Sequence, residues 1–139
     1  MLEAAQRLGV HIPTLCHDPR LDPAGACRAC LVEVEGQRRL QPACAWKATP
    51  GQVVTTRNER IDRHRQVLLS MYLADHPLDE EGRPVESADG NGLRRWQEEL
   101  RADGSDTVPM PAVNAPRQGR EDHNPYIGFE PESCILCAR

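Results

Sequence analysis

Cysteine is the residue type in this chain with the clearest capacity for chemistry. The sequence contains six cysteines among 139 residues. Four of them have the spacing C-x10-C-x2-C-x13-C, namely Cys16, Cys27, Cys30 and Cys44. The inner pair lies in the small-residue stretch PAGACRAC, where backbone amides can approach inorganic sulfide closely. Four thiolates in this pattern can hold an iron–sulfur cluster.

Three other interpretations of the same thiols remain open at this point. A structural zinc ion also takes four thiolates, although zinc sites more often consist of two Cys-x-x-Cys pairs. Disulfides require an oxidising compartment, and the N-terminus does not have the layout of a signal peptide. Unliganded buried cysteines do not usually cluster in so polar a loop. The spacing favours an iron–sulfur cluster and leaves zinc as the main alternative.

The last two cysteines, Cys134 and Cys137, form a second Cys-x-x-Cys pair in the final stretch PESCILCAR. A thioredoxin-like dithiol would place such a pair at the start of a helix within a βαβ pattern. No such pattern surrounds these residues. We therefore interpret the pair as the beginning of a longer ligand run on a truncated chain.

The bulk composition limits the remaining functions. A formal net charge of −4 argues against nucleic acid as the main partner, because the basic surface typical of such proteins is missing. No apolar run approaches the length of a membrane span, so we expect no membrane insertion. With no signal peptide either, we expect a cytoplasmic protein. The chain has two Trp, two Tyr and one Phe, which predicts a small aliphatic core of the kind that a metal often reinforces.

The elements that must position the first four cysteines are short. The pattern MLEAAQRLGV predicts a helix that stops at Gly9. Residues 11–30 contain several prolines and read as loop. Alternating apolar and polar residues in CLVEVEGQRRLQPAC predict a β-hairpin that turns at Glu35–Gly36. Val53 and Val54 indicate another short strand.

Further along the chain, the sequence predicts one long helix and then an extended segment. Residues 58–75 form the best helix, with Thr56 and Glu59 at the spacing of a capping box. The helix would pack on the strands through apolar residues such as Ile61 and Leu69. Residues 77–125 are rich in proline and charge, so we expect a linker in which only residues 93–102 form a helix.

The first half of the chain also resembles a known family. The stretch from Leu2 to Pro77, including HIPTLCHDPRLDPAGACRACLVEVEG and LQPACAW, is similar to the N-terminal [2Fe-2S] module of a large redox family. That family includes alpha subunits of NAD-linked formate dehydrogenases, the G subunit of NADH-quinone oxidoreductase and iron-only hydrogenases. The resemblance implies an α+β, β-grasp ferredoxin-like fold whose first two strands would precede Leu2. It also implies which side chains bind the [2Fe-2S] cluster: Cys16, Cys27, Cys30 and Cys44.

The same resemblance implies a second site that this chain does not preserve. Family members continue with the motif H-x3-C-x2-C-x5-C, which binds a [4Fe-4S] cluster. His76 stands at the histidine position, but Glu80, Arg83 and Asp89 stand at the three cysteine positions. Carboxylates and a guanidinium group cannot replace thiolates around iron and sulfide. We therefore expect no cluster at His76.

The C-terminal pair resembles the entry to the family's tandem [4Fe-4S] domain. The stretch NPYIGFEPESCILC is similar to its beginning, and Cys134 and Cys137 match the first two positions of C-x2-C-x2-C-x3-C-P. Two thiolates cannot hold a cubane by themselves. A [4Fe-4S] cluster is therefore expected only if the chain continues beyond Arg139.

These observations predict three regions: a [2Fe-2S] ferredoxin-like domain at residues 1–76, a degenerate cluster region and linker at 77–125, and the start of a [4Fe-4S] domain at 126–139. The predicted function is an electron-transfer module of a molybdopterin-dependent, formate dehydrogenase-like oxidoreductase. A fragment of the NADH-quinone oxidoreductase G subunit and a zinc-stapled interaction domain are the alternatives. We find no molybdopterin, flavin or dinucleotide site, so no catalytic residue is assigned. The expected partners are other redox subunits or the remainder of a larger chain.

Overall fold

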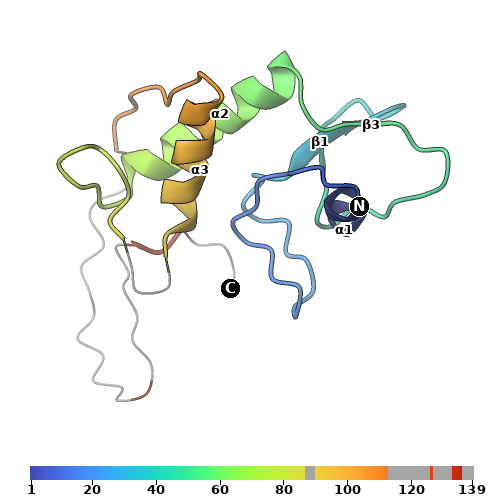
Figure 1. Ribbon diagram of the computed structural model, residues 1–139, viewed down its shortest axis with the longest axis horizontal. Helices are drawn as coiled ribbons and strands as arrows, with labels where there is room; N and C mark the ends of the chain where they lie inside the picture. The colour runs from blue at the N-terminus through green and yellow to red at the C-terminus, as the bar shows by residue number, and fades with distance from the viewer. Residues whose placement is uncertain (87–89, 113–125, 127–132, 136–139) are drawn as a thin grey trace. The chain divides into compact units, whose positions relative to one another are not determined.

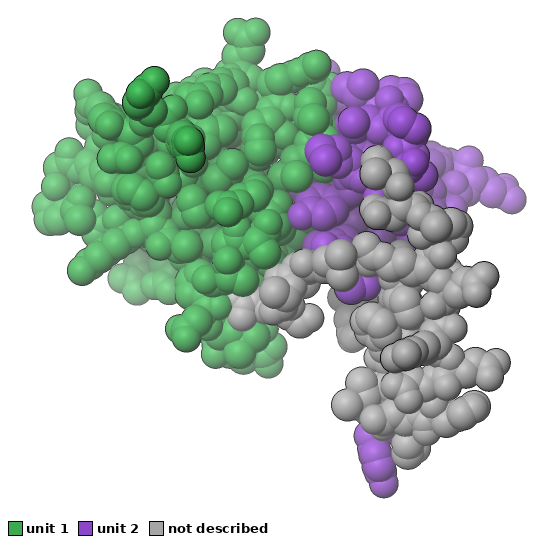
Figure 2. Space-filling model, turned by 180° about the vertical axis from the view of Figure 1, so that it is seen from behind, with its two compact units in different colours: residues 1–68, 137–139 green, residues 69–136 purple. Residues whose placement is uncertain are grey.

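This computed structural model describes residues 1–86, 90–112, 126 and 133–135. The described residues divide into two compact units (Figure 2). The first unit is built mainly from residues 1–68, and the second contains the described residues from Leu69 onward. The four N-terminal cysteines all belong to the first unit.

A small antiparallel sheet forms the centre of the first unit (Figure 1). Its strands are β1 (Leu31–Val34), β2 (Gln41–Pro42) and β3 (Val54–Thr55), in the order β2-β1-β3. Leu31 pairs with Pro42, and Val34 pairs with Val54. Gly36 adopts a φ of 81° in the turn after β1, a conformation that glycine accepts without steric cost. The predicted hairpin and the third short strand are confirmed.

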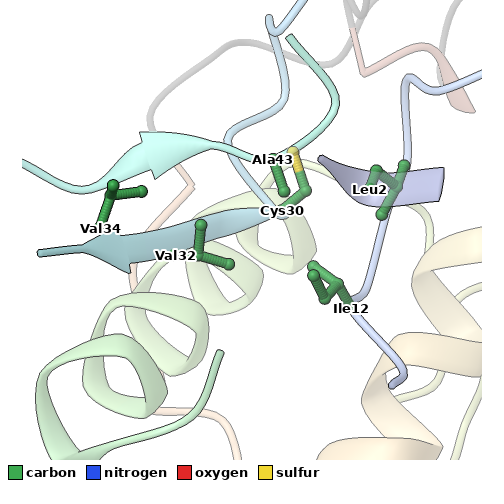
Figure 3. Packing of buried hydrophobic residues seen from close by; sticks show 6 residues of the cluster. All are labelled: Leu2, Ile12, Cys30, Val32, Val34 and Ala43. Carbon is green, nitrogen blue, oxygen red and sulfur yellow. The ribbon is translucent and has the colours of Figure 1, made fainter. Parts of the chain in front are cut away.

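The hydrophobic core of this unit lies where the short N-terminal helix α1 (Leu2–Arg7) meets the sheet. Its buried members are Leu2, Ile12, Cys30, Val32, Val34 and Ala43 (Figure 3). The backbone N–H of Leu2 donates to the carbonyl oxygen of Ala43 at 2.9 Å, which ties α1 to the residue after β2. One proposed ligand, Cys30, is therefore itself part of the core.

Helix α2 (Glu59–Ala74) follows β3 and begins at an asparagine cap. The Asn58 side chain accepts a hydrogen bond from the backbone N–H of Ile61 at 2.9 Å. The same side chain donates to the carboxylate of Glu33 in β1 at 2.6 Å. Asn58 therefore stabilises the first turn of the helix and also connects it to the central strand.

The capping box expected from Thr56 and Glu59 is wrong. Asn58 supplies the cap instead, so the N-cap lies two residues later than that motif requires. The Asn58 side chain accepts from the helix through its amide oxygen and donates to the sheet through its amide nitrogen. The contact with Glu33 joins distant parts of the sequence, so a local capping motif does not reveal it.

The second unit contains helix α3 (Gly92–Ala102), in which Leu93, Trp96 and Gln97 are buried. Before α3, Leu78 and Pro84 form an isolated antiparallel bridge. The Asp79 carboxylate accepts hydrogen bonds from the backbone N–H of Arg83 at 2.8 Å and from its guanidinium Nε at 3.0 Å. Polar contacts hold this segment together where apolar residues are few.

The described architecture is α+β, as predicted. Helices and a three-stranded antiparallel sheet are both present in the described part of the chain. None of the helices that the structure describes combines the length and apolar character needed to cross a membrane.

Candidate metal centre

The sheet brings Cys30 and Cys44 together at one end. Cys30 directly precedes β1, and Cys44 follows β2 after a single residue, Ala43. The backbone N–H of Ala43 donates to the carbonyl oxygen of Cys30 at 3.0 Å, which continues the strand pairing by one step. The chain then turns sharply, since the N–H of Trp46 donates to the carbonyl oxygen of Pro42 at 2.9 Å. This turn holds Cys44 beside Cys30.

The loop that carries Cys27 packs against the same turn. Gly25 adopts a φ of 59°, and a Cβ atom added there would lie 3.8 Å from the Cβ of Ala45, next to Cys44. Arg28, between the two inner cysteines, also has a φ of 59° and is the one described residue other than glycine with a positive φ. Such a conformation is unfavourable for a residue with a side chain. The surrounding loop therefore holds the Cys-x-x-Cys backbone in a defined and tight shape.

Cys16 reaches the site from the preceding loop. The chain before it is anchored by the buried Ile12, and the chain after it turns at once. The Asp18 carboxylate accepts a hydrogen bond from the backbone N–H of Arg20 at 2.9 Å, which closes that turn. Cys16 itself is 2% exposed.

The four thiols fall into two adjoining pairs. Burial raises the pKa of Cys27, and a side-chain hydrogen bond with Cys16 raises it further, while the backbone N–H of Ala29 acts in the opposite direction. Burial raises the pKa of Cys30 to about 12, and the side-chain hydrogen bond and charge of Cys44 contribute to that rise. The charge of Cys27 also acts on Cys30, so the two pairs are close to each other.

This arrangement suits a binuclear iron–sulfur centre better than a single ion. A [2Fe-2S] centre with four cysteine ligands places two thiolates on each iron, whereas structural zinc needs all four on one ion. None of the described cysteines forms a disulfide bond. The donor set therefore fits a [2Fe-2S] cluster.

The site is also shielded from water and supplied with backbone donors. Cys16, Cys27 and Cys30 are at most 2% exposed, while Cys44 is half-buried. The N–H groups of Leu15, Cys16 and Ala29 lower the pKa of Cys27 because they donate to its sulfur. Donors of this kind stabilise thiolate charge and are one means by which a protein adjusts a cluster's reduction potential.

His76 lies in the second unit beside an asparagine amide. The Nδ2 of Asn91 is 3.1 Å from the Nε2 of His76. The Oδ1 of Asn91 accepts a hydrogen bond from the N–H of Leu93 at 2.9 Å and so caps α3. Because that oxygen is occupied, the amide nitrogen faces His76, and the imidazole Nε2 must accept. Burial lowers the pKa of His76, which favours this neutral form.

The residues at the family's cysteine positions near His76 make other contacts. Glu80 is exposed. Arg83 forms ion pairs with Asp79 at 3.0 Å and with Glu81 at 2.8 Å. Asp89 lies outside the described residues. The absence of a cluster at His76 stays a prediction.

The structure describes only one residue of the C-terminal cysteine pair. Cys134 is half-buried, and Cys137 lies outside the described residues. The partial [4Fe-4S] motif that these two residues indicate stays a prediction.

One residue near the centre was not singled out from the sequence. Arg65 is buried in α2, and its guanidinium Nη2 lies 3.4 Å from the carbonyl oxygen of Leu31, the residue after Cys30. The sequence did contain a signal for the burial of Arg65. This residue stands four residues after Ile61 and four before Leu69, both of which are buried. Residues four apart share one face of a helix, so this spacing places a charge within the apolar stripe.

Comparisons with known proteins agree with the geometry of the site. Residues 1–59 match the family described as 2Fe-2S iron-sulfur cluster binding domain. The chain is 39% identical to the G 2 subunit of NADH-quinone oxidoreductase from Rhizobium meliloti, over 100% of this chain and 16% of that protein. It is also 39% identical to the alpha subunit of NADPH-Fe(3+) oxidoreductase from Geobacter sulfurreducens, again over 100% of this chain and 16% of that protein. The chain thus spans about one sixth of the length of these relatives.

A solved structure extends the similarity to the fold. The crystal structure of NAD+-reducing [NiFe]-hydrogenase in the H2-reduced state matches with a TM-score of 0.77 and 34% sequence identity. The match covers 99% of this chain and 55% of the hydrogenase chain. The resemblance stated from the sequence is confirmed, and the cofactor of this chain is a [2Fe-2S] cluster. Over residues 1–59, the chain is therefore similar to the 2Fe-2S iron–sulfur cluster binding domain family.

Proposed function

We propose that this chain is an electron-transfer module of a larger oxidoreductase and that four cysteines hold its cluster: Cys16, Cys27, Cys30 and Cys44. The observation that carries the proposal is the arrangement of these thiols in two adjoining pairs at one end of the sheet. The cluster supplies reversible one-electron chemistry when bound. The protein supplies the thiolates, the backbone donors and the exclusion of water.

The pairing also assigns the ligands to individual irons. Cys16 and Cys27 would share one iron, and Cys30 and Cys44 would share the other, because the structure pairs the thiols in this way. Each thiol must lose its proton to bind, so cluster assembly releases protons. The loop and turn around the site would hold the four sulfurs near one another.

A matched pair of cysteine variants tests the ligand assignment. Cys30→Ser should largely abolish cluster retention after anaerobic reconstitution, because a serine oxygen is a poor ligand for iron in a sulfide core. Cys134→Ser, the control, should retain the cluster at the wild-type level. Visible absorption and iron content of the desalted proteins provide the measurement. Equal retention in both variants would remove Cys30 from the ligand set.

The identity of the complete enzyme is a separate proposal. The sequence motifs favour a formate dehydrogenase-like, molybdopterin-dependent enzyme, with the NADH-quinone oxidoreductase G subunit as the alternative. The relatives carry the names of NADH-, NADPH- and hydrogen-linked proteins, which supports the alternative at least as well. Other redox subunits or further domains would then be the partners, in the cytoplasm. The boundaries at residues 76 and 125 belong to the same proposal.

The native complex that contains this chain separates these alternatives. A formate dehydrogenase should contain molybdenum, and formate should bleach the visible absorption of its clusters under anaerobic conditions. A complex that contains no molybdenum and is reduced by NADH alone would favour the NADH-quinone oxidoreductase assignment. Both measurements leave the ligand assignment unaffected.

A further inference from the structure

Arg65 is a buried cation close to the proposed cluster site. It lies in α2 with 8% of its surface exposed. Its Nη2 donates to the carbonyl oxygen of Leu31 at 3.4 Å. Because Leu31 directly follows Cys30, this contact places the guanidinium group beside the part of the backbone that carries a ligand.

The positive charge of Arg65 is poorly compensated within the described residues. Its Nε is buried and has no hydrogen-bond partner among them. Burial lowers the pKa of Arg65, Asp62 raises it and Arg57 lowers it. The Asp62 carboxylate is 41% exposed and lies 3.8 Å from Arg57, so solvent and a second cation weaken its effect on Arg65. An arginine remains protonated even so, and its charge stays in the interior.

The anion that can balance this charge is the cluster with its thiolates. The charge of Cys30 raises the pKa of Arg65, so the two groups are within electrostatic reach of each other. A [2Fe-2S] centre held by four thiolates carries net negative charge, and one added electron increases it. A buried cation stabilises such charge more than an exposed one, because the effective dielectric constant in the interior is lower.

We propose that Arg65 is the buried countercharge of the [2Fe-2S] centre and raises its reduction potential. This inference rests on the proposed function, and specifically on Cys30 as a ligand. Reduction adds one electron from an external donor, such as dithionite in an assay, to one ferric ion. No bond forms or breaks, and the guanidinium keeps its proton. Its charge therefore favours the reduced state over the oxidised state.

Three variants of the cluster-loaded chain test the proposal. Arg65→Met removes the charge and keeps an unbranched side chain, and Arg65→Lys keeps the charge. Arg63→Met is the matched control, because it makes the same change at an exposed position of the same helix. The measurement is the midpoint potential from a redox titration followed by EPR.

A buried unit charge roughly 10 Å from the cluster, with an effective dielectric constant of about 20, changes the equilibrium constant for reduction on the order of tenfold. Arg65→Met should therefore lower the equilibrium constant for reduction about tenfold, or ~59 mV for one electron. Arg65→Lys and Arg63→Met should stay within about threefold of the wild type. An unchanged potential in Arg65→Met, or equal shifts in Arg65→Met and Arg63→Met, would overturn the proposal.

The lysine variant keeps the test decisive if Arg65→Met does not retain its cluster. A loaded Arg65→Lys protein with a wild-type potential would then support the charge role. Loss of the cluster in Arg65→Lys as well, or a lowered potential there, would assign Arg65 to packing and overturn the proposal. A wild-type chain that binds no iron would instead contradict the proposed function.

Discussion

The Cys30 thiol resists loss of its proton when no metal is bound. Burial is the main cause, and it raises the pKa from the ordinary 9.0 to about 12. Between these two values the unfolded chain loses the proton while the folded chain keeps it. The folded state is then increasingly disfavoured as the pH rises, because it binds more protons than the unfolded state. Binding of iron removes this penalty, since a metal-bound thiolate carries no proton.

The metal-free chain should therefore lose stability as the pH rises from about 9 toward 12. One such proton contributes a slope of about 1.4 kcal/mol per pH unit. Urea unfolding at several pH values under reducing conditions measures this slope. The matched control is metal-free Cys30→Ser, in which the decline should be shallower because the serine hydroxyl does not titrate. Identical slopes for the two proteins would contradict the raised pKa.

At the level of single residues, the convergence of the four thiols could be predicted from the sequence but their pairing could not, and their role as cluster ligands stays a prediction. The spacing of Cys16, Cys27, Cys30 and Cys44 indicated four convergent thiols. Which thiol lies beside which depends on the strand register that places Cys44 next to Cys30. The burial of Arg65 also escaped prediction, because it depends on how α2 meets the sheet rather than on local sequence.

At the level of elements, Asn58 connects α2 to the strand that leads out of the cluster loop. Its side chain caps the helix and donates to Glu33, while Arg60 reaches the same carboxylate at 3.0 Å. This arrangement fixes the start of α2 relative to β1. Arg65, further along the same helix, then lies beside Leu31.

Asn58→Ala should destabilise the first unit, because it removes both the cap and the contact with Glu33. Loss of a cap alone typically costs about 1 kcal/mol. The control is Thr56→Ala, which alters the capping residue expected from the sequence and should change stability by less than about 0.5 kcal/mol. Urea unfolding of both variants gives the comparison. A larger loss in Thr56→Ala than in Asn58→Ala would restore the capping-box interpretation.

The elements themselves were largely predictable from local patterns. The alternation of apolar and polar residues around LVEV predicted the hairpin. The spacing of apolar residues predicted helices with bounds close to those of α2 and α3. The cap was predicted two residues too early, because the contact between Asn58 and Glu33 joins distant parts of the sequence. The individual contacts around Asp79 were not predicted, because composition does not reveal such ion pairs and hydrogen bonds.

At the level of the whole molecule, the described residues contain one proposed cluster site, in the first unit. The second unit presents His76 to Asn91 rather than to thiols among the described residues. The chain covers 16% of its NADH-quinone oxidoreductase relative. On the proposed function, electrons that enter the cluster would pass to other parts of a larger assembly. The [2Fe-2S] centre would then be one of several redox centres. Burial, backbone donors and Arg65 would set its reduction potential locally.

The metal content of the anaerobically reconstituted chain tests the central claim most directly. We expect about two iron atoms and two sulfides per chain, in a red-brown protein whose dithionite-reduced form gives the EPR signal of one [2Fe-2S] centre. Stoichiometric zinc with no bound iron would contradict the claim and favour a zinc-stapled domain. About six irons per chain would also contradict it, because a second, [4Fe-4S] cluster would then be present.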